Sequence, residues 1–254
     1  MQLPPVGLGT MAIDEPEVVT TALEEGYRHL DTAHIYENEH VVGAGLAASD
    51  VPREEAIVAT KLWIDDLAPG RLRPAVEESL DRLGLERLDL LYVHRPRGEY
   101  DPVGTLPAVD AVVEDGLASH VGLSNFTVEQ LATARDQLEA PLAAHQVERH
   151  PLFTSDDVLA DAREHDYPLV AYSPLAGGRV SDLPELQRVA ERYETTPEAV
   201  AIAWLVGTDG VVTIPKASSR RHLRANRAAA SLELDADDRA LIESVDREEE
   251  LFPE

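Results

Sequence analysis

The sequence predicts a (β/α)8 barrel, and three observations support this fold. The chain has 254 residues, a length at which one large domain buries a sizeable core. Eight short apolar runs alternate with segments of helical period, which is the pattern of a barrel of parallel strands. Because no linker, low-complexity segment or charge block divides the sequence, we expect residues 1–254 to form a single domain.

The strands are predicted from short runs rich in apolar and β-branched residues. They are expected at residues 6–10, 27–32, 56–61, 88–94, 119–125, 143–148, 168–174 and 211–216. The intervening segments place apolar residues three and four positions apart, which predicts helices that cover the barrel. These helices are expected at 15–26, 38–49, 70–84, 103–116, 127–139 and 155–165, within 181–208, at 219–230 and at 236–247.

Helix start and stop signals agree with these ranges. Thr127 with Gln130 forms a capping-box pattern, and Gly84 and Gly116 stand where C-terminal caps are expected. The alternative to the barrel is a doubly wound open sheet, which would normally carry a glycine-rich phosphate loop after its first strand. Here GLGT is followed by Met11 and two further apolar residues, so that motif is absent and the barrel is favoured.

The composition disfavours several classes of partner. Acidic residues outnumber basic ones by 48 to 22, which gives a net charge of −26 and disfavours nucleic acid and membrane surfaces. No apolar run approaches the roughly 20 residues of a spanning helix. The absence of cysteine excludes disulfides and thiolate metal sites. The N-terminus lacks the pattern of a signal peptide, so we expect a cytoplasmic protein.

The basic residues are 20 arginines and two lysines, Lys61 and Lys216. With the dispersed acidity, this favours adaptation to concentrated salt, where the screening length falls to about 3 Å at molar ionic strength. A GC-rich genome that favours arginine codons is the alternative. In a sequence that has replaced nearly all its lysines, those that remain are expected where a compact ammonium is required, because the planar guanidinium cannot imitate it. Both lysines end buried-strand runs.

Polar side chains stand at the C-terminal ends of the predicted strands, where barrel enzymes carry their chemistry. In chain order they are Asp31, Tyr36, Lys61, His94, Ser124, Asn125, Gln146, Glu148, Tyr172, Ser173 and Lys216. Each alone has an ordinary structural explanation, such as a helix cap or a hydrogen-bonded core residue. Their convergence on one mouth is what predicts a site.

An aspartate, a tyrosine, a lysine and a histidine together suit the protonation of a forming alkoxide. An ammonium from Lys61 would lower the pKa of the Tyr36 phenol, and Asp31 would supply the counter-charge. A neutral His94 imidazole would orient a carbonyl oxygen. The hydride must come from a cofactor, because no side chain supplies one. Tyr172 offers a ring on which a flat cofactor can stack.

A metal site is not expected. His34 lies between Asp31 and Tyr36, but the stretch HIYENEH lacks the H-E-x-x-H arrangement of a zinc enzyme. The other histidines show no ligand spacing. A metal-dependent barrel hydrolase therefore ranks third among the candidate functions, behind the two given below.

The sequence resembles the aldo-keto reductases, especially their short microbial members, over nearly its whole length. The matching stretches are VGLGT, GYRHLDTAHIYENEHVVGAGL, VATKLW, LDLLYVHRP, VGLSNF, HQVE, AYSPLAGG and VVTIPKASSRRHLRAN. The resemblance implies a barrel that binds an extended nicotinamide dinucleotide, NADPH or NADH, at its mouth. It implies that Tyr36 is the general acid, that Lys61 tunes it, that Asp31 pairs with Lys61, and that His94 orients the substrate oxygen.

The resemblance also implies a set of cofactor contacts. The nicotinamide end would meet Ser124, Asn125, Gln146 and Tyr172, the pyrophosphate Ser173 and Leu175, and the adenosine end Lys216, Ser218, Arg221, His222 and Asn226. Ala217, His222 and Ala225 depart from the family pattern at positions that read the 2′-phosphate and adenine. The choice between NADPH and NADH therefore stays open.

The positions that resemble the substrate pocket hold Met11, Trp63 and Arg95. Arg95 indicates an acidic or hydroxylated substrate, the alternative being a surface ion pair. The chain ends soon after its last helix, so we expect an open pocket that accepts many carbonyl substrates. The main hypothesis is an NAD(P)H-dependent reductase of aldehydes and ketones, acting as a monomer. A cofactor-binding sensor with negligible turnover is the alternative.

Overall fold

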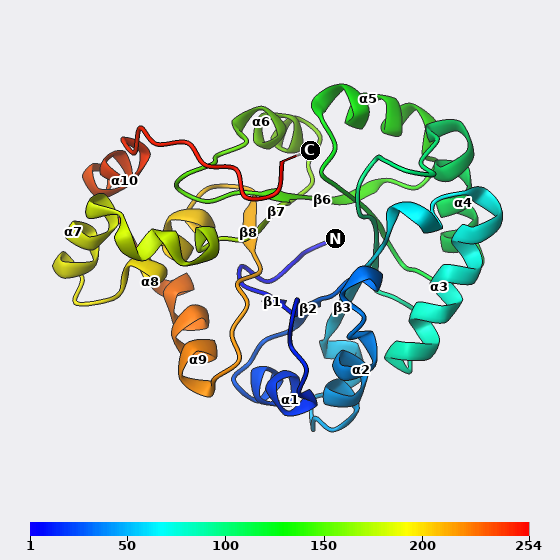
Figure 1. The fold of residues 1–254 in the computed structure, drawn as a ribbon, viewed down its shortest axis with the longest axis horizontal. Helices are drawn as coiled ribbons and strands as arrows, with labels where there is room; N and C mark the ends of the chain where they lie inside the picture. The colour runs from blue at the N-terminus through cyan, green and yellow to red at the C-terminus, as the bar shows by residue number, and fades with distance from the viewer. Residues whose placement is uncertain (254) are drawn as a thin grey trace.

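The computed structural model describes residues 1–253 and forms the predicted eight-stranded parallel barrel (Figure 1). The strands pair in sequence order, each with the next, and all registers are parallel. They are β1 (Leu8–Gly9), β2 (His29–Asp31), β3 (Ile57–Leu62), β4 (Leu90–Val93), β5 (Val121–Ser124), β6 (Leu142–Glu148), β7 (Leu169–Tyr172) and β8 (Val211–Thr213).

The barrel closes where the segment before β1 meets β8. Val6 forms a parallel bridge with Thr213, the amide of Gly7 donates to the carbonyl of Thr213 at 2.8 Å, and the amide of Thr213 donates to Pro5 at 2.9 Å. Closure leaves no free sheet edge and brings the C-terminal ends of all eight strands to one mouth.

Ten α-helices and five short 3-10 helices surround the barrel in the described part of the chain. The α-helices are α1 (Pro16–Glu24), α2 (Glu39–Ala47), α3 (Pro69–Leu83), α4 (Pro102–Glu114), α5 (Val128–Gln137), α6 (Asp156–Glu164), α7 (Pro184–Arg192), α8 (Pro197–Val206), α9 (Arg220–Ala228) and α10 (Ala236–Glu243). The 3-10 helices are η1 (His34–Tyr36), η2 (Arg53–Glu55), η3 (Ile64–Asp66), η4 (Ala176–Asp182) and η5 (Ala229–Ser231).

The caps form as the sequence predicts. Thr127 and Gln130 make a reciprocal capping box at the start of α5, and Gly84 ends α3 with φ +66°, a left-handed conformation that favours glycine. Within the predicted helical stretch 181–208 the structure forms two helices, α7 and α8. Pro197 explains the break, since proline has no N–H to continue a helix and fits its first turn.

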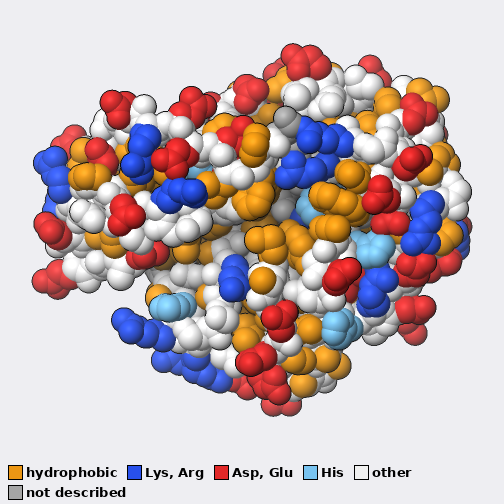
Figure 2. Space-filling model, viewed as in Figure 1, with side chains coloured by type: hydrophobic (Ala, Val, Ile, Leu, Met, Phe, Trp, Pro, Cys, Tyr) orange, Lys and Arg blue, Asp and Glu red, His pale blue; other side chains and the backbone are white. Residues whose placement is uncertain are grey.

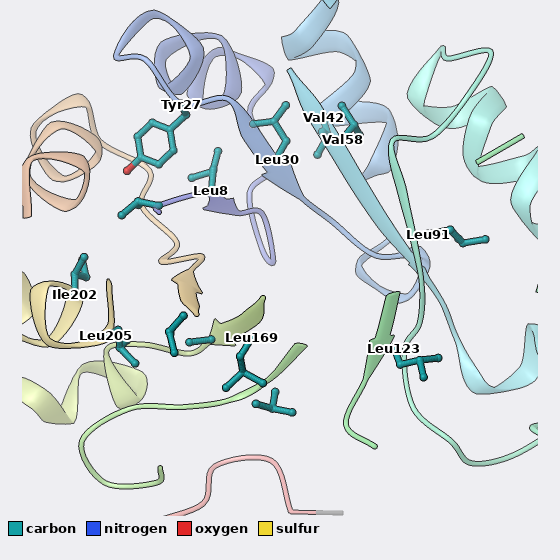
Figure 3. Packing of buried hydrophobic residues seen from close by; sticks show 14 of the residues in the cluster. Leu8, Tyr27, Leu30, Val42, Val58, Leu91, Leu123, Leu169, Ile202 and Leu205 are labelled. Carbon is teal, nitrogen blue, oxygen red and sulfur yellow. The ribbon is translucent and has the colours of Figure 1, made fainter. Parts of the chain in front are cut away.

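The core has two parts. The larger lies between strands and helices, where Leu30 of β2 and Val58 of β3 lie near Val42 of α2 (Figure 3). The smaller fills the barrel interior around Tyr92, which is fully buried. Because successive strand residues face opposite sides, Leu30 faces the helices while its neighbour Asp31 faces the interior. Because of this alternation, polar side chains at the strand ends point into the barrel interior.

Acidic and basic side chains are interspersed over the face in Figure 2, around a hollow bordered by hydrophobic side chains near the centre. In the part of the chain that the structure describes, no helix has both the length and the apolarity to cross a membrane.

We expect Gly43→Ala to lower the free energy of unfolding by about 1–3 kcal/mol, the usual cost of overpacking. A Cβ at Gly43 would lie 2.3 Å from the carbonyl oxygen of Leu83, so α2 and α3 would have to separate. Gly70→Ala is the matched control, because a Cβ there meets nothing within 4 Å. Urea denaturation of both variants measures the difference, and equal stabilities would contradict the close helix contact.

Candidate active site

The strand ends surround a cavity of about 240 Å³. Among the residues expected at the site, those that line it are Met11, Asp31, Tyr36, Trp63, His94, Arg95, Asn125, Gln146, Tyr172, Ser173 and Lys216. A larger groove of about 800 Å³ lies beside α6, α8 and α10, but none of these strand-end residues line it. The 240 Å³ cavity is therefore the candidate active site.

A buried ion pair forms the floor of this site. The Lys61 ammonium donates to Asp31 Oδ1 and, at 2.8 Å, to the backbone carbonyl of Thr32. Gln146 donates from Nε2 to the other Asp31 oxygen at 2.8 Å. Burial by itself would lower the pKa of Lys61, but the charge of Asp31 and the nearby Tyr36 phenol outweigh it and raise the pKa. Lys61 is therefore a permanent cation beneath the cavity.

Tyr36 lies above this pair, carried by η1 just after β2. Its ring centroid is 5.3 Å from Lys61 Nζ. Burial raises the pKa of Tyr36, and the Lys61 ammonium only partly opposes this. The ammonium lowers the pKa of Tyr36 as expected, but burial of the phenol is the larger effect, so the net shift of the pKa is upward. The phenol is thus protonated and ready to donate.

His94 follows β4 directly and completes the group. Its ring lies 6.1 Å from that of Tyr36 and 4.9 Å from that of Trp63, both edge to face. Burial, assisted by the charges of Lys61 and Arg95, lowers the pKa of His94 to about 2. The imidazole is therefore neutral, as the sequence predicts, and one ring nitrogen carries a proton that it can donate to an oxygen.

Amide side chains from β5 and β6 form another wall. Asn125 is in the left-handed region with φ +61°, and its Nδ2 donates to the His94 carbonyl at 3.0 Å and to Ser124 Oγ at 3.1 Å. The Tyr172 hydroxyl donates to Asn125 Oδ1 at 2.9 Å. These bonds fix the Tyr172 ring and the Asn125 amide together beside Gln146. Ser124 is buried behind them rather than on the cavity surface.

The residues expected at the dinucleotide tail follow β8 and lie outside the cavity, except Lys216. Lys216, Ser218, Arg221 and His222 are exposed, whereas Asn226 is buried. Ser219 caps α9 by accepting from the His222 amide at 3.3 Å. Leu175 is half-buried and does not line the cavity. The structure thus brings the predicted catalytic residues together at one cavity. Most of the residues predicted to contact the adenosine end of the cofactor lie on the surface outside it.

The C-terminal tail reaches the cavity. Phe252, near the C-terminus, lines the cavity and packs edge to face on Tyr172 with ring centroids 5.9 Å apart. The sequence carries no signal for this contact, since a short tail can point anywhere. Gly9, Thr10, Ile35, Pro174 and Ile214 also line the cavity without having been predicted. Gly9 and Thr10 lie in the VGLGT stretch, which could have indicated them.

The structure also describes the surroundings of His34. Its Nδ1 lies 2.7 Å from Asp66 Oδ2, an ordinary side-chain pair. Within residues 1–253 no group of three or more histidines and carboxylates could hold a metal ion.

Comparison with known proteins identifies the family. The model of the Aldo/keto reductase family matches residues 5–247. The chain is 36% identical to methylglyoxal reductase DkgB of Escherichia coli O157:H7 over 253 residues, covering 97% of this chain and 94% of that protein. It is 33% identical to glyoxal reductase of Bacillus subtilis (strain 168) over 257 residues, covering 100% of this chain and 92% of the relative.

A solved structure agrees with these relatives. MGS-M4, an aldo-keto reductase from a Medee basin deep-sea metagenome library, superposes with a TM-score of 0.94 and 32% identity, covering 100% of this chain and 95% of that one. The fold and cavity are those of a barrel enzyme. The chain belongs to the aldo/keto reductase family and is an oxidoreductase that reduces carbonyl groups. The comparisons give no support to a sensor without turnover.

We expect the His94 imidazole to stay neutral at about pH 5, because burial and nearby cations lower its pKa to about 2. Imidazole ¹⁵N shifts recorded from about pH 4.5 to 8 test this, with His94→Gln to assign the signal. A His94 signal that titrates within this range would contradict it.

The lowered pKa of His94 also makes the stability of the fold depend on pH. The unfolded ring has the ordinary pKa of 6.5, so below that pH the unfolded chain binds a proton that the folded chain does not. The contribution of His94 to stability is therefore present above pH 6.5 and is lost as the pH falls toward 2.

Proposed function

We propose that this protein reduces small aldehydes and ketones with NADPH or NADH as the hydride donor, and that Tyr36 is the general acid. One observation carries the proposal: a protonated phenol, a neutral imidazole and a buried ammonium–carboxylate pair meet at one cavity. This donor set can protonate an oxygen as it gains negative charge, and the family reduces carbonyl groups.

The residues of the cavity fit a nicotinamide. Tyr172 presents an aromatic ring at the cavity surface, and Asn125 and Gln146 present primary amides beside it. Each amide has two donor hydrogens and two lone pairs, so the bonds they already make leave capacity for a carboxamide. When bound, the reduced nicotinamide supplies the hydride that no side chain can supply.

The chain's own residues then have distinct roles. His94 donates a hydrogen bond to the carbonyl oxygen, which polarises the bond and holds its carbon at the site of attack. Tyr36 transfers its hydroxyl proton to this oxygen as negative charge develops there. Lys61 stabilises the phenolate that Tyr36 becomes, and Asp31 keeps the ammonium in place beneath it.

The outer residues are suited to the phosphates. Lys216 and Arg221 are exposed, and neither belongs to an ion pair formed among residues 1–253. By contrast, Arg220 and Arg224 of the same helix are held by Glu24 and Glu25. In a chain of net charge −26, two unpaired cations, one lining the cavity and one outside it, favour an anionic ligand. We propose that they bind the phosphates of the dinucleotide.

The substrate is proposed to be a small carbonyl compound such as methylglyoxal. Relatives at 36% and 33% identity are named methylglyoxal reductase and glyoxal reductase. The cavity is small, and Met11, Ile35, Trp63 and Phe252 give it an apolar wall. Arg95 adds a cation to this wall, which suits a substrate with a second oxygen-bearing group.

We expect Tyr36→Phe to lower kcat for methylglyoxal by about 10²–10⁴-fold, the usual contribution of general acid catalysis. Cofactor affinity should stay within about two-fold, since the ring remains. Tyr193→Phe, the same change at the end of α7, is the matched control. Steady-state kinetics and fluorescence titration with NADPH measure the two quantities. Full turnover by Tyr36→Phe would refute the assignment.

We expect Arg221→Ala to weaken NADPH binding by about ten-fold, the value of one charged hydrogen bond. NADH binding should change less, because NADH lacks the 2′-phosphate. Arg188→Ala removes an exposed arginine from α7 and controls for the change in net charge. Fluorescence titrations at low salt give both dissociation constants. Equal weakening of the two cofactors would exclude Arg221 as the 2′-phosphate contact.

A further inference from the structure

The segment after α10 returns across the mouth of the barrel. In Figure 1 it runs from α10 at the edge of the helix ring over the β7 and β6 side of the barrel. Its backbone is tied at Glu249, whose amide donates to the carbonyl of Leu152 at 2.9 Å, and whose carboxylate pairs with Arg179 of η4 at 3.0 Å. The segment therefore lies against the loops after β6 and β7.

The end of this segment is held by one buried carboxylate. Glu148 is 3% exposed, and its Oε1 and Oε2 accept the backbone amides of Leu251 at 2.7 Å and Phe252 at 3.0 Å. A buried carboxylate needs such donors, and hydrogen bonds to a charged group are the strong ones. The mechanism proposed above gives Glu148 no part, so these bonds are unexplained by it.

His150 fixes this carboxylate in turn. The Leu152 amide donates to His150 Nδ1 at 3.2 Å, so Nδ1 is the acceptor nitrogen of the ring. His150 Nε2 lies 2.8 Å from Glu148 Oε1 and therefore carries the proton and donates to it. Both side chains are buried. The carboxylate thus accepts from one ring N–H and two tail amides.

The position of Glu148 in the sheet places the tail at the active site. It follows Gln146 by two residues, so both point to the same side of β6, and it pairs in register with Tyr172 of β7. Phe252, the residue whose amide Glu148 accepts, packs its ring on Tyr172 and lines the cavity. Backbone bonds at Glu148 therefore determine where the phenyl ring stands.

We infer that Glu148 is a positioning residue for substrate binding. By holding the Leu251 and Phe252 amides it seats the Phe252 ring as the outer wall of the cavity, where it contacts substrate bulk beyond the reacting carbonyl. Affinity for larger apolar aldehydes then depends strongly on Glu148, while affinity for three-carbon substrates depends on it less. The kinetic part of this inference rests on the proposed function.

The kinetic test compares E148Q, F252A and the double variant on benzaldehyde and methylglyoxal. We expect F252A to raise KM for benzaldehyde by about 5–10-fold, because the phenyl ring no longer packs on the substrate, and to raise KM for the smaller methylglyoxal by less. E148Q should change the two KM values as F252A does. In this variant one tail amide faces the NH2 group of the glutamine, a second donor, and loses its hydrogen bond. The KM of the double variant for benzaldehyde should be no higher than that of F252A alone.

The matched control is E39Q, which alters a carboxylate that is also fully buried but accepts from Thr60 and Arg82 on α2's side of the barrel. It should leave the benzaldehyde KM unchanged. Additive effects of E148Q and F252A, or an unchanged benzaldehyde KM in both, would overturn the inference. So would an equal rise in KM for E39Q, because that would make the effect one of general destabilisation.

Hydrogen–deuterium exchange gives a readout that needs no turnover. In E148Q the amides of Leu251 and Phe252 should exchange about ten-fold faster, while those of β6 stay protected. Unchanged exchange would overturn the inference. If E148Q does not fold, a chain ending at Glu248 must match F252A in its benzaldehyde KM, and a wild-type KM in that chain overturns the inference. Absence of all turnover in the wild type refutes the proposed function, whereas the exchange result still decides the role of Glu148.

Discussion

The site depends on the ion pair between Lys61 and Asp31, which lies at the centre of the barrel. Removing two charges from water costs several kcal/mol per ion, and their attraction offsets this only with good geometry and further hydrogen bonds. The Thr32 carbonyl satisfies the ammonium, and the Gln146 amide satisfies the carboxylate. These groups come from β2, β3 and β6, so the pair is stable only in the closed barrel.

The charge of this pair sets the protonation of its neighbours. The Lys61 ammonium contributes to keeping His94 neutral, although burial is the larger cause, and it opposes the effect of burial on the pKa of Tyr36. The group therefore contains one cation, one anion and two neutral donors. This is a suitable resting state for a site that receives negative charge on a substrate oxygen, because both donors carry their protons before the substrate arrives.

Much of this site could be predicted from the sequence, because its residues stand at the ends of strands and strand ends converge in any barrel. Asp31, Lys61, His94 and Gln146 are found in this way, and all four contribute to the observed site. The direction in which the pKa of Tyr36 shifts could not be predicted, because the cost of desolvation depends on how deeply the phenol is buried. The break between α7 and α8 was available in the sequence at Pro197.

The sequence by itself determined the alternation of strands and helices, the caps, and which polar side chains face the mouth, because these follow from local periodicity and backbone chemistry. Only the tertiary structure decided that Phe252 lines the cavity and that Glu148 accepts its backbone amide. Glu148 and Phe252 are over 100 positions apart in the chain. Their contact is made by backbone amides, which every residue except proline carries, so no side-chain pattern in the sequence records it.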